Sequence, residues 1–189
     1  MKKILISMIA CAMMLPLGCE KIKDATSRDF KVNNIQFDFT ATTKDDVSTT
    51  IGNPSVTTRA AAITSFTVTR TVDISELGSD DLVEYANKIN KIVVNNSIVS
   101  ITASSAGDYT ITNLTITAEG VGDLIIPSYS IGGTFSAPSN MNSYTSDFLM
   151  KLLSVKKINV TVKGQSDAPA GTTIYINYKS DIVCTASLL

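Results

Sequence analysis

The sequence predicts a mainly β protein in which two antiparallel sheets pack face to face. Short runs of alternating apolar and polar residues recur along the chain, and glycine, proline, asparagine and aspartate separate them. Serine and threonine are frequent between the apolar positions, as expected for solvated outer faces. This spacing is typical of an antiparallel, immunoglobulin-like β-sandwich, with an open β-barrel carrying helices as the alternative. Two short helices interrupt the pattern, and we expect them in crossover connections.

The first two strands are expected over residues 35–41 and 66–74, where apolar side chains occupy every second position. Between them, residues 44–59 show no periodicity and predict a long loop. Arg70 falls on the apolar face of the second strand. A buried guanidinium requires an acidic partner, so Arg70 is expected to pair internally or to lie near the open end of its strand. Contact with a ligand is the further option.

Seven more strands are expected over residues 91–94, 98–103, 109–118, 124–131, 157–163, 172–178 and 182–187. In the strand expected over residues 109–118, the apolar side chains switch from odd to even positions near Asn113, which predicts a β-bulge. Pro127 inside its run predicts an edge strand or a bulge. Asn95 and Asn96 predict a turn between the strands expected over residues 91–94 and 98–103.

Both helices have recognisable start signals. Ser79 precedes Asp80 and Asp81, and serine caps a helix while acidic residues favour its positive end. The second helix is expected to start at Thr145 or Ser146. Each helix leads into a strand of similar sequence.

This similarity predicts an internal strand–helix–strand repeat over residues 63–103 and 129–178. Alternatively, any short amphipathic helix that feeds a strand gives such a pattern.

The first residues are typical of an export signal. Two lysines precede an apolar run that is too short to span a bilayer, and a small residue follows it. We therefore expect a signal peptide over residues 1–18, a tether over 19–33, and a single β-sandwich domain over 34–189.

Leu17, Gly18 and Cys19 resemble the lipobox of bacterial outer-membrane lipoproteins, although Pro16 stands where that family prefers leucine. In that family the cysteine is acylated, for example with palmitate, and becomes the mature N-terminus. The resemblance implies that Cys19 is lipidated. It also implies a place in the cell envelope, anchored to the outer membrane on its periplasmic side or at the cell surface. A secretory signal with a chance cysteine is the alternative.

Composition restricts the chemistry. The chain has no histidine, which excludes Ser-His-Asp and Cys-His catalysis and imidazole metal sites. The formal charge is −1 and becomes −3 without the two lysines of the signal, so nucleic acid is not an expected partner. Cys184 would be the only thiol left, and its strand-like surroundings predict a small buried hydrophobe. We expect no cofactor, metal or catalytic residue.

A few residues are candidates for recognition or processing. Tyr129 and Phe135 flank a glycine-containing stretch and, with Tyr144, predict a recognition edge, because exposed aromatics stack on sugars and protein surfaces. Alternatively, these aromatics face the core. Arg59 lies in an unpatterned segment where proteases cut, a layout distantly similar to that of lipoprotein pilins trimmed after an arginine.

The sequence therefore favours a lipid-anchored envelope protein that acts as a non-catalytic binding or adhesion module for a polysaccharide, an envelope protein or a host protein. The alternatives are a polymerising, pilus-like subunit and a carrier of lipid or another small ligand. A carboxylate-based glycosidase, which needs two acids about 5–10 Å apart, is less favoured. The acids considered for it are Asp38, Asp73, Glu76, Glu84 and Glu119.

Overall fold

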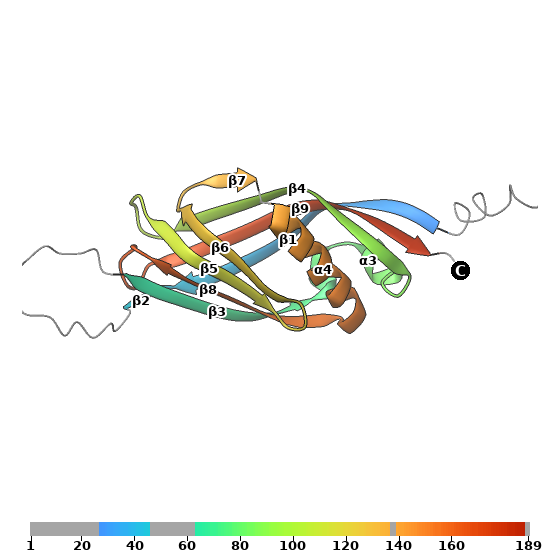
Figure 1. Ribbon diagram of the computed structural model, residues 1–189, viewed down its shortest axis with the longest axis horizontal. Coiled ribbons are helices and arrows are strands. Elements are labelled where there is room, and N and C mark those ends of the chain that lie inside the picture. The colour runs from blue at the N-terminus through green and yellow to red at the C-terminus, as the bar shows by residue number, and fades with distance from the viewer. Residues whose placement is uncertain (1–26, 46–62, 137–138, 188–189) are drawn as a thin grey trace, which may run out of the picture.

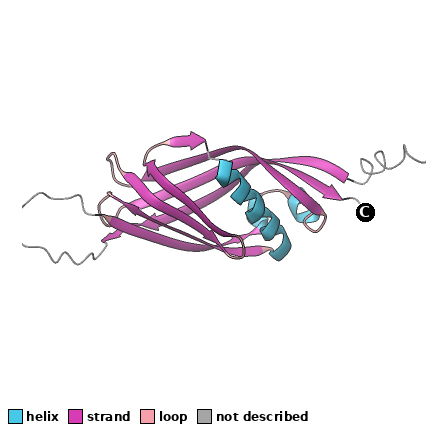
Figure 2. Ribbon diagram, in the orientation of Figure 1, coloured by secondary structure: helices cyan, strands magenta, loops and turns pink. Residues whose placement is uncertain are grey.

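The structure, a computed structural model, describes residues 27–45, 63–136 and 139–187, and the side chains of residues 134–136 and 139 lie outside the description. Two antiparallel sheets pack into a sandwich (Figures 1 and 2), as predicted. The four-stranded sheet has the order β1 (Ser27–Thr42), β9 (Thr173–Ser187), β4 (Ile89–Ala103) and β7 (Thr134–Ser136). The five-stranded sheet has the order β2 (Lys44–Asp45), β3 (Thr64–Asp73), β8 (Lys157–Ser166), β5 (Thr110–Ala118) and β6 (Gly122–Ser130).

The helices lie in crossover connections, which confirms that prediction. The 3-10 helix η1 (Ile74–Leu77) and α3 (Asp80–Glu84) join β3 to β4, and α4 (Ser139–Val155) joins β7 to β8. One crossover therefore leaves the five-stranded sheet and the other enters it. In each strand–helix–strand unit the two strands belong to different sheets, and the strand after the helix pairs with the first strand of the other unit: β4 with β7, and β8 with β3. The two units therefore have the same arrangement, with the roles of the two sheets exchanged. The helices differ in length, five residues against 17, and the internal repeat stays a prediction.

Strand β1 begins at Ser27, inside the stretch predicted as a tether. Its first residues pair with the last residues of β9, from Ser27 opposite Ser187 onward. A bulge between Val32 and Ile35, with Asn34 at φ 57°, shifts the apolar positions from even to odd numbers. The alternation from Ile35 onward therefore revealed only the second half of the strand.

The turn predicted at Asn95 and Asn96 is wrong. β4 runs unbroken through these residues, and a second bulge, with Asn96 at φ 49°, bends it. The runs 172–178 and 182–187 likewise belong to one strand, β9. The bulge predicted at Asn113 is confirmed by its φ of 53° and a register shift, and Pro127 lies in β6 at the edge of its sheet, as predicted.

One helix start was predicted correctly and the other was not. The Ser79 Oγ accepts a hydrogen bond from the Leu82 amide at 3.4 Å and caps α3. Helix α4, however, begins at Ser139, so Thr145 and Ser146 lie inside it. The Ser146 hydroxyl donates to the Ile92 carbonyl oxygen at 2.8 Å. The polar first turns of α4 resemble a loop in sequence, because few apolar side chains mark its buried face.

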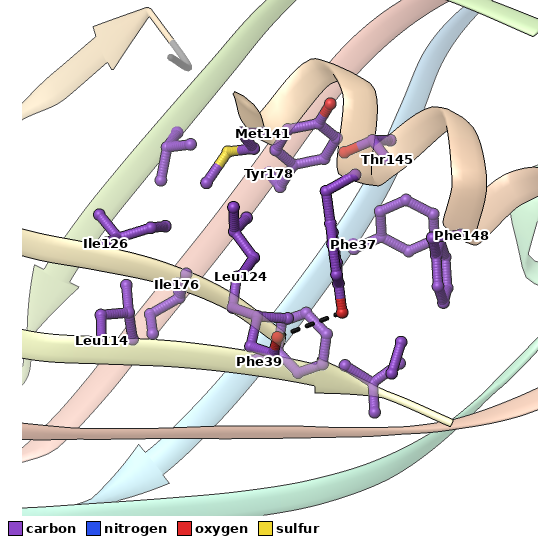
Figure 3. Close-up of a pocket in the computed structure, with 15 residues that line it drawn as sticks. Phe37, Phe39, Leu114, Leu124, Ile126, Met141, Thr145, Phe148, Ile176 and Tyr178 are labelled. Atoms are coloured by element: carbon purple, nitrogen blue, oxygen red, sulfur yellow. Dashed lines mark hydrogen bonds between the residues drawn. The ribbon is translucent and has the colours of Figure 1, made fainter. Parts of the chain in front are cut away.

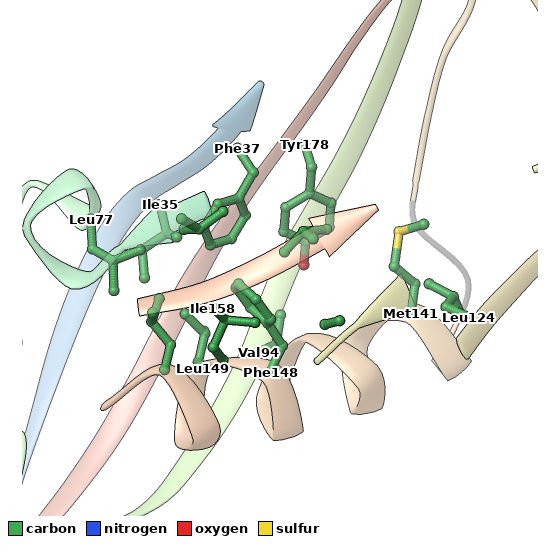
Figure 4. Packing of buried hydrophobic residues seen from close by; sticks show 14 of the residues in the cluster. Ile35, Phe37, Leu77, Val94, Leu124, Met141, Phe148, Leu149, Ile158 and Tyr178 are labelled. Atoms are coloured by element: carbon green, nitrogen blue, oxygen red, sulfur yellow. The ribbon is translucent and has the colours of Figure 1, made fainter. Parts of the chain in front are cut away.

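The core lies between the sheets (Figure 4). It is closed differently on its two sides. On one side the edge strand β1 contacts β3, which β2 covers only at Thr64 and Ser65. On the other side α4 packs over β4, β6 and β8 and fills the gap between the sheets. Phe148 of α4 meets Phe37 of β1 edge-to-face, with ring centroids 5.3 Å apart, a favourable aromatic geometry. No helix within the described ranges combines the length and hydropathy needed to cross a bilayer.

Candidate binding groove

A polar hollow of about 350 Å³, here called the outer groove, lies on the solvent face of the five-stranded sheet. Its lining residues come from three neighbouring strands: Ser65, Phe66, Thr67, Asn113, Thr115, Lys163, Gly164 and Gln165. The volume is within the range of roughly 300–1,000 Å³ that is usual for small-ligand sites.

The bulge in β5 explains why a hollow forms here. Pairing between β5 and β8 shifts register between Thr112 and Thr115, around Asn113. The Asn113 side-chain amide donates to the Gln165 side-chain oxygen at 3.1 Å, and the Thr115 hydroxyl donates to the Asn113 carbonyl oxygen at 3.3 Å. These bonds hold the bulge in one conformation. Bulges bend the strand and re-aim side chains, and this one opens the sheet surface beside β8.

The polar side chains of the groove form a regular grid. Strand pairing places Thr67, Lys163 and Thr115 in one row across three strands. Ser65 and Gln165 lie side by side in the next row. Neighbouring strands are about 4.8 Å apart, and residues two positions apart on a strand share a face. Hydroxyl, amide and ammonium groups therefore face solvent at a spacing fixed by the sheet.

Gly164 and Phe66 form the floor. They pair across β8 and β3 and face the core. A Cβ on Gly164 would lie 2.7 Å from Cζ of Phe66 and 3.4 Å from Cγ2 of Ile111. The aromatic ring, only 2% exposed, occupies the space that a side chain at position 164 would need, so packing favours glycine there.

The charge in the groove is positive. Lys163 is exposed, and no carboxylate lines the hollow. Among the described residues the ion pairs join Arg70 to Glu76 and Lys157 to Asp73, so the Lys163 ammonium is in neither of them. The groove thus offers one positive charge among neutral hydrogen-bonding groups.

A second hollow lies inside the sandwich beneath α4 (Figure 3) and measures about 60 Å³. Its walls are apolar and include Phe37, Phe39, Leu114, Leu124, Ile126 and Ile176. The Tyr144 hydroxyl lies within hydrogen-bonding distance of the carbonyl oxygens of Ile116 (3.2 Å) and Gly122 (3.1 Å). Burial raises the pKa of Tyr144 to about 12. This cavity holds far less than the roughly 300 Å³ at which ligand sites begin.

Arg70 pairs internally, which was the first of its expected roles. Its Nη1 donates to the Asp38 carbonyl oxygen of β1 at 2.6 Å, and its Nη2 forms an ion pair with Glu76 of η1. The guanidinium also lies over the Phe39 ring, 5.8 Å from the centroid. Arg70 therefore ties β3 to β1 at the edge of the other sheet, and these contacts engage both Nη atoms of its guanidinium.

The structure does not bring the predicted aromatic edge together. Tyr129 is half-buried on β6 opposite Ile111, and burial raises its pKa. The Tyr144 hydroxyl lies at Gly122, at the other end of the same strand. Phe135 lies in β7, in the other sheet, and its side chain is outside the description.

Two predicted sites, Cys19 and Arg59, lie outside the described residues. The predicted buried thiol is confirmed, because Cys184 is fully enclosed and burial raises its pKa to about 11.

Several carboxylates of the described residues make structural contacts, and Asp73 is the clearest case. Asp73 accepts hydrogen bonds from the Ser75 amide and hydroxyl and lies 3.0 Å from Nζ of Lys157. These contacts, chiefly the backbone bond from Ser75, lower the pKa of Asp73 to about 2. Neither hollow is lined by an aspartate or a glutamate. Within the described ranges no three His, Cys, Asp or Glu residues gather where they could hold a metal.

Sequence reasoning missed the outer groove. The available signals were the parity switch at Asn113 and the glycine at position 164, directly after the predicted run 157–163, since bulges and strand glycines mark irregular sheet surfaces. What the sequence did not reveal is that β8 lies between β3 and β5.

No protein-family model and no curated protein matches the chain. Among solved structures, one of Desmodium yellow mottle tymovirus has a TM-score of 0.34 at 12% identity, covering 86% of this chain and 90% of that one. A structure of infectious bursal disease virus, Gx strain, has a TM-score of 0.21 at 11% identity, and the match covers 85% of this chain and 32% of that one. Dimeric latent PorU from Porphyromonas gingivalis has a TM-score of 0.23 at 12% sequence identity, and the match covers 83% of this chain and 13% of that one. Likenesses this weak carry no argument.

Proposed function

We propose that this chain is a lipid-anchored, non-catalytic binding module of the cell envelope and that the outer groove is its binding surface. The observation that carries the proposal is the position of the groove relative to the start of the first strand. Ser27 and Ser187 pair at one end of the molecule, whereas Thr64 and Ser166, which adjoin the groove, pair at the other (Figure 1).

This arrangement suits a protein held at its N-terminus. Cys19 lies eight positions before Ser27. β1 has 16 residues, which span roughly 50 Å at about 3.3 Å per residue. Several acyl chains on one cysteine give a stable anchor, since each buried methylene contributes about 0.8 kcal/mol. An anchor there leaves the groove at the end of the domain that is far from Ser27.

A binding role fits the chemistry better than the alternatives. A glycosidase needs two carboxylates in one cleft, and neither hollow contains one. A lipid carrier needs an apolar cavity of several hundred cubic ångströms, against the 60 Å³ present. The outer groove is large enough without any rearrangement.

The test is to express the full chain in a Gram-negative host and to compare it with Cys19→Ala. We expect an intact mass that includes acyl chains, and membrane association that Cys19→Ala abolishes. The detergent-solubilised lipoprotein is then applied to arrays of polysaccharides and envelope proteins. Binding should be lost when Lys163→Gln and Gln165→Ala are combined and kept in Lys179→Gln, which changes a lysine exposed on the other sheet. Unlipidated protein, or arrays without signal, would overturn the proposal.

A polymerising subunit is the second candidate, because β1 is an edge strand that precedes Arg59. β1 places alternate side chains, among them Phe37 and Phe39, in the core. Cleavage after Arg59 would leave this strand attached by non-covalent contacts alone and so exchangeable between copies. Treatment with an arginine-specific protease should then give ladders on a mild gel, and Arg59→Gln should not. A stable monomer after cleavage at this site would exclude strand exchange.

A further inference from the structure

We infer that the ligand of the outer groove is an acidic polysaccharide, with an anionic group of a sugar on Lys163 and sugar hydroxyls on the surrounding grid. This inference rests on the proposed function and gives it a ligand class.

The charge argument comes from Lys163 and its surroundings. Lys163 is in the middle strand of the groove, with Thr67 on one side and Thr115 on the other. No carboxylate lines the groove. Asp123 lies in the row of outward-facing residues next to that of Lys163, and its carboxylate accepts a hydrogen bond from the Thr117 hydroxyl. An ammonium among neutral donors attracts an anion, and a charge-assisted hydrogen bond is roughly twice as strong as a neutral one.

The neutral groups favour a hydroxylated ligand. The hydroxyls of Ser65 and Thr67 can both donate and accept, and the Thr115 hydroxyl, which donates to the Asn113 carbonyl oxygen, can still accept. Sugar hydroxyls do the same, so a sugar can satisfy this grid. A protein partner is less suited, since binding hot spots are mostly aromatic or arginine anchors in apolar pockets, and Phe66, the aromatic residue of the lining, faces the core.

The groove also favours a polymer over a single sugar. It is open to solvent and has no exposed aromatic ring for stacking among its lining residues, so one contact should be weak. Many anchored copies on one surface, each holding one repeat of the same chain, raise the overall affinity by roughly 10²–10⁴ without new contacts. A polysaccharide with a repeated anionic sugar meets this requirement.

The experiment uses the full lipidated chain in liposomes over immobilised polygalacturonate, with a neutral galactan and a phosphorylated mannan as parallel surfaces. We expect binding to polygalacturonate, to the phosphorylated mannan or to both, and none to galactan. The two acidic surfaces separate a carboxylate from a phosphate as the recognised group. Raising the salt concentration should weaken binding, because the contact is electrostatic.

Variants at Lys163 test the assigned contact. Lys163→Gln should lower binding at least tenfold and Lys163→Arg should retain it, while Lys179→Gln on the opposite sheet should stay within twofold. Circular dichroism melts establish that all three variants are folded. Equal binding to galactan, or an unchanged signal in Lys163→Gln, would overturn the inference.

The same data separate this inference from the proposed function. If the groove variants abolish binding to a neutral glycan or to an envelope protein on the arrays, the ligand class is wrong and the binding module stands. If no surface and no array binds the lipidated protein, both are wrong.

Discussion

Gly164→Ala should destabilise the fold, although it adds a single carbon to a strand. The new Cβ would lie 2.7 and 3.0 Å from two ring carbons of Phe66, where carbon atoms normally stay about 3.5–4.0 Å apart. The ring is 2% exposed, so it must shift against its buried neighbours to admit the new carbon. Overpacking of this kind costs about 1–3 kcal/mol, and the lower entropy of the unfolded alanine chain returns about 0.4–1 kcal/mol. We expect a net loss of about 1–2 kcal/mol.

Phe66→Leu supplies the matched rescue. Alone it leaves a cavity and should cost less than the roughly 3–5 kcal/mol of a phenylalanine-to-alanine change. Combined with Gly164→Ala it removes the ring atoms that the new Cβ meets, so the double variant should be at least about 1 kcal/mol more stable than the sum of the single effects. Contacting residues commonly show couplings of this size.

Urea unfolding followed by circular dichroism gives the three free energies, because the chain has no tryptophan for fluorescence. Melting temperature should fall by about 2–8 °C for Gly164→Ala, at roughly 2–4 °C per kcal/mol for a domain of this size. If Gly164→Ala is as stable as the parent, or if the two substitutions simply add, Phe66 does not occupy the space at position 164 and the floor of the groove is built differently.

Three further outcomes are expected. Tyr144→Phe should lower the free energy of unfolding by about 0.5–1.5 kcal/mol, because it removes the hydroxyl that donates to the carbonyl oxygen of Ile116 or Gly122; unchanged urea stability would contradict that role. The lowered pKa of Asp73, about 2 against an ordinary 3.8, means that its contacts stabilise the fold fully above about pH 4, and that this contribution disappears as the pH falls toward 2. Asp73→Asn should therefore lose less stability than the parent across that window, and parallel urea titrations would reveal it. Cys184 should resist a thiol reagent at pH 8 until denaturant is added, as followed by the mass of the peptide that carries it; rapid labelling of folded protein would show that the thiol is accessible.

Periodicity in the sequence was enough to predict the sandwich, both crossovers and the cap at Ser79. It failed at bulges. Val32 and Ile35 both face the core although their parity differs, and the strand was therefore expected to begin too late. Asparagines at positive φ mark three bulges, at positions 34, 96 and 113. Because asparagine also favours turns, Asn96 was read as a chain reversal.

The outer groove depends on strand order, which local sequence does not specify. Thr67, Lys163 and Thr115 are far apart along the chain and meet only because β8 inserts between β3 and β5. Arg70 shows the opposite case. Its place on an apolar face was visible in the sequence, and burial of its charge required a partner, but Glu76 was identified only once η1 turned that carboxylate back toward β3.

The way the two sides of the sandwich are closed determines whether a ligand could reach its interior. Arg70 ties the β1–β3 side, and the other side is open to the interior only if α4 moves. Five apolar side chains of α4 are buried: Met141, Phe148, Leu149, Leu152 and Leu153. At about 1.5–3 kcal/mol each, exposing them would cost about 8–15 kcal/mol, similar to the roughly 5–15 kcal/mol that stabilises an entire domain. Lifting α4 therefore amounts to unfolding, whereas the outer groove is formed and accessible in the folded state, as the proposed function requires.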